Sequence, residues 1–133
     1  MESVEVWEDS ARKTYSILVI DDEENICEIL MEFLKREGYT VATALSGGKG
    51  LALFREKYFD TVITDLNIPD LSGWDIARQI RKEKPNTFII LLTGWETKID
   101  DINNLEKNVD MVLHKPIDFP KLSGIVRDAC AKT

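Results

Sequence analysis

Five side chains of the kind that bind metal ions or phosphate each follow an apolar run of this sequence. They are Asp21, Asp22, Asp65, Thr93 and Lys115. Three carboxylates brought together suit a hard cation, and Mg²⁺ is the usual occupant because it binds oxygen, keeps several waters and bridges to phosphate. A lysine ammonium supplies a positive charge for phosphoryl oxygens, and a threonine hydroxyl supplies a hydrogen-bond donor. Since a carboxylate can also act as a nucleophile, the set indicates metal-assisted phosphorylation of one aspartate.

The order of apolar and amphipathic segments explains how such distant residues would meet. Continuous apolar runs predict strands at residues 17–20, 39–45, 61–64, 88–92 and 109–113. Apolar residues at helical spacing predict helices at residues 23–37, 46–58, 74–84, 96–107 and 119–131. Strict alternation of strand and helix is typical of an α/β protein with a doubly wound parallel sheet, whose strands are buried on both faces. We therefore expect one domain with helices on both sides of the sheet.

In such a sheet, ligands bind beyond the carboxyl ends of the strands. The first predicted strand leads into Asp21 and Asp22, the third into Asp65, the fourth into Thr93, and the fifth stops shortly before Lys115. Two carboxylates about 4 Å apart repel each other by roughly 4 kcal/mol near a protein surface. A bound cation would offset this repulsion, so the clustered acids are themselves an indication of a metal site.

These residues, together with the segment that follows Asp65, resemble the receiver domain of two-component response regulators. The segment reads Asp65-Leu66-Asn67-Ile68-Pro69-Asp70-Leu71-Ser72-Gly73. The resemblance implies a (βα)5, flavodoxin-like fold with a five-stranded parallel sheet in the strand order 2-1-3-4-5. It assigns residues 15–132 to the receiver domain and leaves residues 1–14 as a loose amino-terminal extension.

The resemblance also implies a metal-binding role for four residues. Asp65 would be the phosphoacceptor and would share a Mg²⁺ ion with its neighbours in space. Asp22 would bind the ion directly, Asp21 would bind it mostly through water, and Asn67 would contribute its backbone carbonyl. The implied cofactor is therefore Mg²⁺.

Two further residues would bind the phosphoryl group, and two others depart from the family pattern. By resemblance, Thr93 would bind a phosphoryl oxygen and shift on activation. Lys115 would pair with the phosphoryl group, beside a Lys115–Pro116 peptide bond that is cis in the family; an X-Pro bond prefers trans by only about 0.5–1 kcal/mol. In most receivers the residue three before this lysine is aromatic and moves with the threonine, but here it is Val112. Trp95 would shield the phosphoryl group from water, which implies slow autodephosphorylation.

We therefore expect a receiver that accepts a phosphoryl group on Asp65 from a sensor histidine kinase or a histidine phosphotransfer protein. It would catalyse only its own phosphorylation and dephosphorylation and turn over no external substrate. A downstream protein would bind the surface formed by residues 96–107, 109–113 and 119–131, and a homodimer on phosphorylation is a further candidate. Asp and Asn residues are poor helix formers, so we expect the helix at residues 96–107 to be only marginally stable and to take part in switching.

Three alternatives stay open from the sequence. The chain is either a stand-alone receiver or one excised from a larger regulator or hybrid kinase. A Mg²⁺-dependent phosphohydrolase of small phosphoesters is the competing enzyme class, although no second general acid–base group accompanies Asp65. The last alternative is a receiver-like protein that only binds partners. We expect Glu23 and Glu24 to be first-turn acids of a helix rather than ligands, and His114 to be a surface residue.

Composition excludes several other classes of protein. The net charge of −7 disfavours direct nucleic-acid binding, which needs a basic face. No apolar run approaches the ~18 residues of a membrane span, and the acidic amino terminus does not resemble a secretory signal. The two cysteines, Cys27 and Cys130, lie far apart without a metal-binding pattern, so we expect them to be reduced. Together these features predict a soluble cytoplasmic protein.

Overall fold

The computed structural model describes residues 14–94 and 108–132. Its strands are β1 (Ser16–Ile20), β2 (Thr40–Ala44), β3 (Thr61–Asp65), β4 (Phe88–Thr93) and β5 (Met111–His114). Its helices are α2 (Glu24–Arg36), α3 (Gly47–Glu56), α4 (Gly73–Glu83) and α6 (Phe119–Ala131). The predicted helix at residues 96–107, Trp95 and nearly all of the predicted amino-terminal extension lie outside the described residues.

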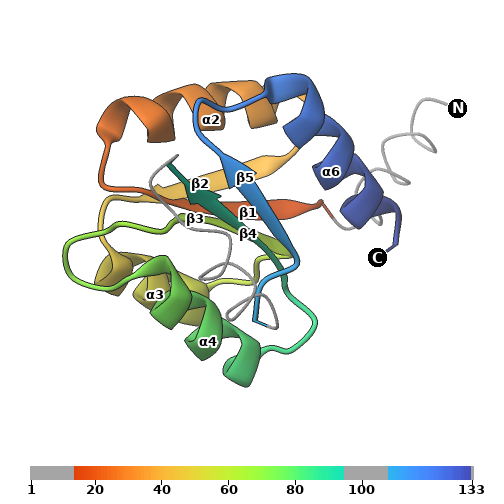
Figure 1. Ribbon diagram of the computed structural model, residues 1–133. Helices are drawn as coiled ribbons and strands as arrows, with labels where there is room; N and C mark the ends of the chain where they lie inside the picture. Colours follow the sequence, from red (N-terminus) through yellow and green to blue (C-terminus); the bar gives the residue numbers. More distant parts are fainter. Residues whose placement is uncertain (1–13, 95–107, 133) are drawn as a thin grey trace, which may run out of the picture.

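The strands form one parallel sheet in the order β2-β1-β3-β4-β5 (Figure 1), which confirms the predicted fold class and strand order. In the register of the sheet, Ile20 of β1 pairs with Thr64 of β3, and Thr93 of β4 pairs with His114 of β5. Asp65, the last residue of β3, pairs with Leu92 of β4. The register therefore brings the carboxyl ends of these strands together at one edge of the sheet.

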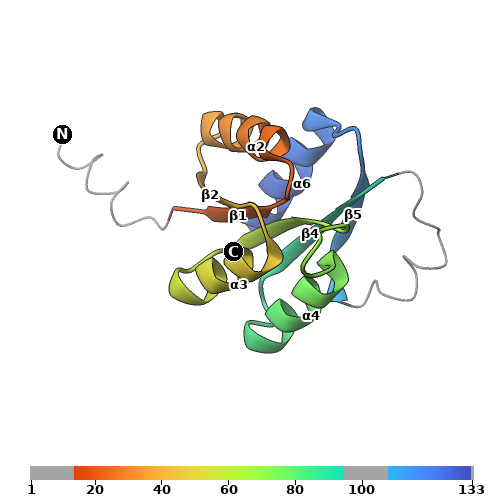
Figure 2. The ribbon, with the colours of Figure 1, turned by 90° about the vertical axis from the view of Figure 1, so that its left-hand side faces the viewer.

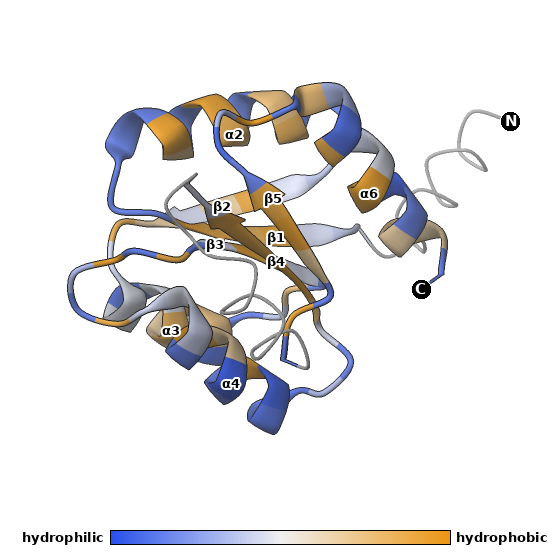
Figure 3. Cartoon of the chain, viewed as in Figure 1, coloured by the Kyte–Doolittle hydropathy of each residue, from blue (hydrophilic) through white to orange (hydrophobic). Residues whose placement is uncertain are grey.

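The sheet is covered on both faces, as Figure 2 shows: α2 and α6 lie on one side and α3 and α4 on the other. Side chains of β1 alternate between the two cores. Ile17 and Val19 belong to the core under α2 and α6, whereas Leu18 and Ile20 belong to the core under α3 and α4. In Figure 3 the apolar colour accordingly gathers on the strands between the helices. None of the described helices is long and apolar enough to cross a membrane.

Helix ends in the structure follow from capping residues in the sequence. Ser46, Ser72 and Asp118 begin α3, α4 and α6, and the side chain of each accepts a hydrogen bond from a backbone N–H of its own helix's first turn. Gly38 follows α2 with a φ of 100°, a conformation that glycine adopts without steric cost.

Two predicted elements differ from the structure by more than one residue at an end. The helix predicted at residues 46–58 ends at Glu56, because Lys57 has an extended backbone. Tyr58, the last residue of the predicted helix, lies outside α3 and is 51% exposed. The strand predicted at residues 109–113 runs from Met111 to His114, since these are the residues that pair with β4. Apolar periodicity located both elements, but it did not determine the residues at which they begin or end.

Candidate functional site

The carboxyl edge of the sheet gathers the acidic and basic residues that the sequence singles out. Asp21 directly follows β1, Asp65 and Thr93 are the last residues of β3 and β4, and Lys115 directly follows β5. Asp22 comes next after Asp21 in the loop that leads to α2. The topology of the sheet, rather than proximity in sequence, therefore assembles this site.

Three carboxylates lie close enough to share one cation. Asp21, Asp22 and Asp65 each offer an oxygen atom, and these atoms all lie within 4.8 Å of one another. Asp21 is fully buried and Asp65 is 6% exposed, while Asp22 is open to solvent. Oxygen ligands of this number and charge, with one side open for water, are compatible with a divalent metal ion such as Mg²⁺.

Lys115 contacts two of these three aspartates. Its Nζ lies 3.0 Å from Asp65 Oδ1 and 3.1 Å from Asp21 Oδ2. A third carboxylate, that of Glu23, lies 3.2 Å from the same nitrogen. The ammonium is therefore fully engaged by carboxylate oxygens, and it is only 21% exposed.

Burial sets the protonation behaviour of the site. It raises the pKa of Asp21 and that of Asp65 above their usual values, because a desolvated carboxylate disfavours its charged form. The hydrogen bond from the Glu23 backbone N–H and the charge of Lys115 oppose this effect at Asp21. Burial also lowers the pKa of Lys115, but its hydrogen bonds and charge interactions with Asp65 and Asp21 outweigh burial and raise that pKa overall. Lys115 thus stays protonated and supports the anionic form of both aspartates.

The remaining predicted site residues lie around this centre. Thr93 is fully buried at the end of β4, and Asn67 is exposed in the loop that follows Asp65. The Lys115–Pro116 peptide bond is cis, as the resemblance implied. Val112, which stands where an aromatic residue is usual in the family, is half-buried and packs against the core under α3 and α4.

The contact between Glu23 and Lys115 was not predicted from the sequence. Glu23 occupies the position before α2, as expected for a helix-terminal acid, but its side chain makes no capping hydrogen bond. The side chain instead contacts Lys115. Glu24 and His114 are exposed, as predicted. A run of acids directly after a strand was the available signal, but the sequence does not show which of them faces the distant lysine.

Gly73 and Asp70 determine how the loop after Asp65 packs, and these roles were not predicted from the sequence. A Cβ atom at Gly73 would lie 2.5 Å from the Asp65 carbonyl oxygen, so the first turn of α4 needs glycine for its close approach to β3. The Asp70 carboxylate accepts hydrogen bonds from the backbone N–H groups of Gly47 at 2.9 Å and Gly48 at 2.8 Å. The loop after Asp65 is therefore held both against α4 and against the amino end of α3.

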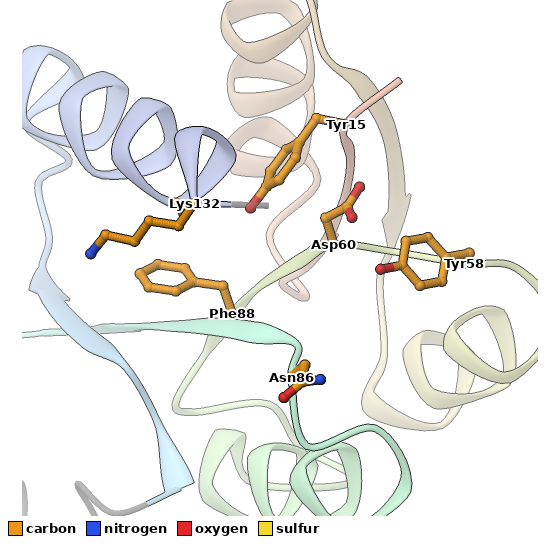
Figure 4. Close-up of a pocket in the computed structure, with 7 residues that line it drawn as sticks. Tyr15, Tyr58, Asp60, Asn86, Phe88 and Lys132 are labelled. Carbon is orange, nitrogen blue, oxygen red and sulfur yellow. The ribbon is translucent and has the colours of Figure 1, made fainter. Parts of the chain in front are cut away.

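Two of the cavities among the described residues lie at opposite ends of the strands. One of about 230 Å³ lies beside Lys115 and is lined by Ile26, Ile29, Lys115, Pro116, Ile117 and Phe119. The other, of about 400 Å³, lies at the amino ends of the strands and includes Tyr15, Tyr58, Asp60 and Lys132 in its wall. Figure 4 shows the Tyr58 hydroxyl pointing toward Asp60 and the Lys132 ammonium pointing away from it. Asp60 Oδ2 accepts a hydrogen bond from the Ser16 N–H at 2.8 Å, so this carboxylate stabilises the start of β1.

Comparison with known proteins identifies the family. The profile of the response regulator receiver domain matches residues 17–127. The chain belongs to this family. It is therefore a receiver domain of the two-component regulatory systems, and its solved relatives have the same fold.

The receiver is similar to the amino acid sequences of several longer regulators. It is 36% identical over 116 residues to the probable transcriptional regulator ycf27 of Cyanidium caldarium, an alignment that covers 87% of this chain and 46% of that protein. It is 33% identical over 111 residues to the response regulator ArlR of Staphylococcus aureus, covering 84% of this chain and 50% of that protein. The chain thus spans half or less of the length of these curated relatives.

Solved receiver structures match nearly the whole chain. A response regulator receiver domain protein from Clostridium thermocellum is 37% identical, with a TM-score of 0.82 and coverage of 89% of this chain and 95% of that one. The response regulator TrrA of Thermotoga maritima, solved in complex with Mg²⁺-BeF, is also 37% identical, with a TM-score of 0.80 and coverage of 87% and 99%. Both likenesses extend well beyond the site residues to the whole sheet.

Proposed function

We propose that this receiver is phosphorylated on Asp65 in a Mg²⁺-dependent reaction and that phosphorylation changes its binding surface. The observation that carries this proposal is the contact of 3.0 Å between Lys115 Nζ and Asp65 Oδ1 beside two further carboxylates. A nucleophile, a cation for the phosphoryl oxygens and a metal-ligand set are thereby side by side. The Mg²⁺-BeF complex of TrrA supports the proposal, since that relative holds a metal ion together with a small fluoride ligand.

In the proposed reaction, one Asp65 carboxylate oxygen attacks the phosphorus atom of a phosphohistidine on the donor protein. A P–O bond forms, the P–N bond breaks, and its electron pair stays with the imidazole nitrogen, which takes a proton from water. Lys115 keeps Asp65 anionic before attack and faces the transferred phosphoryl oxygens afterwards. The buried Thr93 hydroxyl at the end of β4 would donate to one of these oxygens.

Asp21, Asp22, Asp65 and the Asn67 carbonyl would hold the metal ion. When bound, Mg²⁺ neutralises negative charge on the phosphoryl oxygens and so lowers the repulsion between donor and acceptor. Asp21 is fully buried and Asp22 is exposed, so the two acids would approach the ion from the protein side and the solvent side respectively. Hydrolysis of the acyl phosphate by water would return Asp65 to its carboxylate and release inorganic phosphate.

The donor would be a sensor histidine kinase or a histidine phosphotransfer protein. Any such donor must bring its imidazole to Asp65. The apolar cavity beside Lys115 lies next to Asp65, because Lys115 lines the cavity and contacts Asp65. Ile29 on the exposed side of α2 is 49% exposed there, which gives a protein partner apolar area to bury. The downstream surface predicted on residues 96–107 lies outside the described residues, so within the described part β5 and α6 remain the proposed output surface.

The test is the intact mass of the protein after incubation with acetyl phosphate and Mg²⁺. We expect one phosphoryl adduct, absent from Asp65→Asn and from a sample treated with EDTA. If acetyl phosphate gives none, the same samples are incubated with a panel of phosphorylated histidine kinases. A protein that stays unmodified by both donors would contradict the proposal.

The competing phosphohydrolase function predicts a different result in the same samples. An enzyme would release phosphate from a small phosphomonoester over many turnovers, whereas a receiver would release about one equivalent per phosphorylation cycle of its own aspartate. His114, the single histidine of the sequence, is exposed and directly precedes Lys115. Its substitution by Gln should leave adduct formation unchanged. Sustained turnover that His114→Gln abolishes would favour the enzyme.

A further inference from the structure

Lys115 is shared by three carboxylates, of which only two belong to the proposed metal set. Its Nζ lies 3.0 Å from Asp65, 3.1 Å from Asp21 and 3.2 Å from Glu23. An ammonium group has three N–H donors, so these three contacts use its whole capacity. A phosphoryl group that binds Lys115 must therefore displace at least one of them.

Glu23 is the partner that can leave at least cost. Its side chain is 62% exposed, against 0% for Asp21 and 9% for Asp65, so water replaces Lys115 readily at Glu23 only. Glu23 also stands at the amino end of α2, where a negative charge is favourable even without the lysine because of the helix dipole. The Glu23 carboxylate thus has two acceptable environments. The buried Asp21 carboxylate has no water to replace Lys115, and the Glu23 backbone N–H satisfies only its other oxygen, at 2.9 Å.

We propose that Glu23 is a positioning residue that holds Lys115 in its resting place and competes with the phosphoryl group for it. The inference rests on the proposed phosphorylation of Asp65 and deepens it. Glu23 slows phosphoryl transfer by occupying one N–H donor of Lys115. After transfer, its carboxylate would leave Lys115 and stay in solvent beside the amino end of α2. Since Ile26 and Ile29 of α2 line the cavity beside Lys115, the same exchange connects the chemistry to the surface on which a donor protein would dock.

The experiment compares Glu23→Gln with Glu24→Gln, because Glu24 is an exposed acid of the same first helical turn and carries the same charge. The rate of adduct formation with acetyl phosphate should rise by about two- to fivefold in Glu23→Gln, the range that an exposed ion pair spans. It should stay near the wild-type rate in Glu24→Gln. In a Lys115→Met background, Glu23→Gln should lose its advantage, because Glu23 acts through the lysine and not by repelling the donor directly.

A second readout needs no phosphorylation. The ¹³Cε resonance of Lys115, assigned by its loss in Lys115→Met, should shift in Glu23→Gln and not in Glu24→Gln. A Glu23→Gln rate no greater than that of Glu24→Gln, or an advantage that persists without Lys115, would overturn the role of Glu23 while leaving phosphorylation of Asp65 intact. A wild-type protein that accepts no phosphoryl group from any donor would instead overturn the proposed function, and the role of Glu23 with it.

Discussion

Gly73 should be irreplaceable because α4 begins against the backbone at the end of β3. A Cβ atom there would lie 2.5 Å from the Asp65 carbonyl oxygen and 2.9 Å from Leu66 Cα, and both are backbone atoms. It would also lie 2.6 Å from Cδ1 of the fully buried Leu91. None of these atoms is the free end of a flexible surface chain, so backbone must shift. We expect Gly73→Ala to lower the free energy of unfolding by about 1–3 kcal/mol, the usual cost of overpacking.

The matched control is Gly124→Ala in α6, where nothing lies within 4 Å of the added Cβ. Alanine in a helix interior is favoured over glycine by about 0.5–1 kcal/mol, so this variant should be stabilised. Urea denaturation measures both changes, provided that the slopes stay equal to that of the wild type. Gly73→Ala should also form the acetyl phosphate adduct more slowly, since Asp65 would be displaced from Lys115. A Gly73→Ala protein with the wild-type denaturation midpoint and rate would refute the reasoning.

Arg81→Ala should destabilise the fold by about 1–3 kcal/mol in urea. The half-buried guanidinium would lose its hydrogen bonds to Asp110 and to the Thr87 carbonyl, each 2.8 Å long. Arg78→Ala, which loses an exposed ion pair of the same helix, should change stability by at most ~0.5 kcal/mol, and equal effects would contradict this ranking. Burial raises the pKa of Tyr15 to about 12, so its phenol should ionise last of the tyrosines in an absorbance titration, and Tyr15→Phe should remove that late step. Because this folded-state pKa exceeds the ordinary value of about 10, the neutral hydroxyl contributes stability that is fully present below about pH 10 and is lost as the pH rises toward 12. Mg²⁺ at about 100 times its Kd should stabilise the protein by about 2.7 kcal/mol in thermal melts, and Asp22→Asn should reduce this gain; a gain of equal size in the variant would count against Asp22 as a ligand.

The sheet and the acidic trio could be predicted from the sequence because both follow from where apolar runs end. A parallel sheet brings the carboxyl ends of its strands to one edge, so Asp21, Asp65 and Lys115 had to meet once their strands were recognised. The strand order came from the family resemblance, and the structure agrees with it. Roles within the site, such as nucleophile or metal ligand, stay proposals because they concern bound groups rather than the fold.

Contacts that depend on side-chain direction could not be predicted in this way. Glu23 was recognised as a helix-terminal acid, but only the positions of α2 and β5 in space show that it reaches Lys115. The close approach of Gly73 to Asp65 depends on how α4 leaves the sheet. Asp70 likewise bonds the amino end of α3 across the site loop. Periodicity gives the buried face of each element, but it contains no information on the distance between two loops.

The charged groups of the site lower the stability of the folded chain. Burial raises the pKa of Asp21 and of Asp65, which means that the folded chain holds their negative charges at a cost. Lys115 supplies one positive charge against three carboxylates in contact with it, so an excess of negative charge remains at neutral pH. A packed apolar edge would cost less. The excess negative charge favours the binding of a cation. Under the proposed function, Lys115 and the three aspartates that could hold the metal ion are in place before a phosphoryl group arrives. Of the three carboxylates in contact with Lys115, only that of Glu23 is exposed. A change at Glu23 can therefore alter the net charge around Lys115 without disturbing the core.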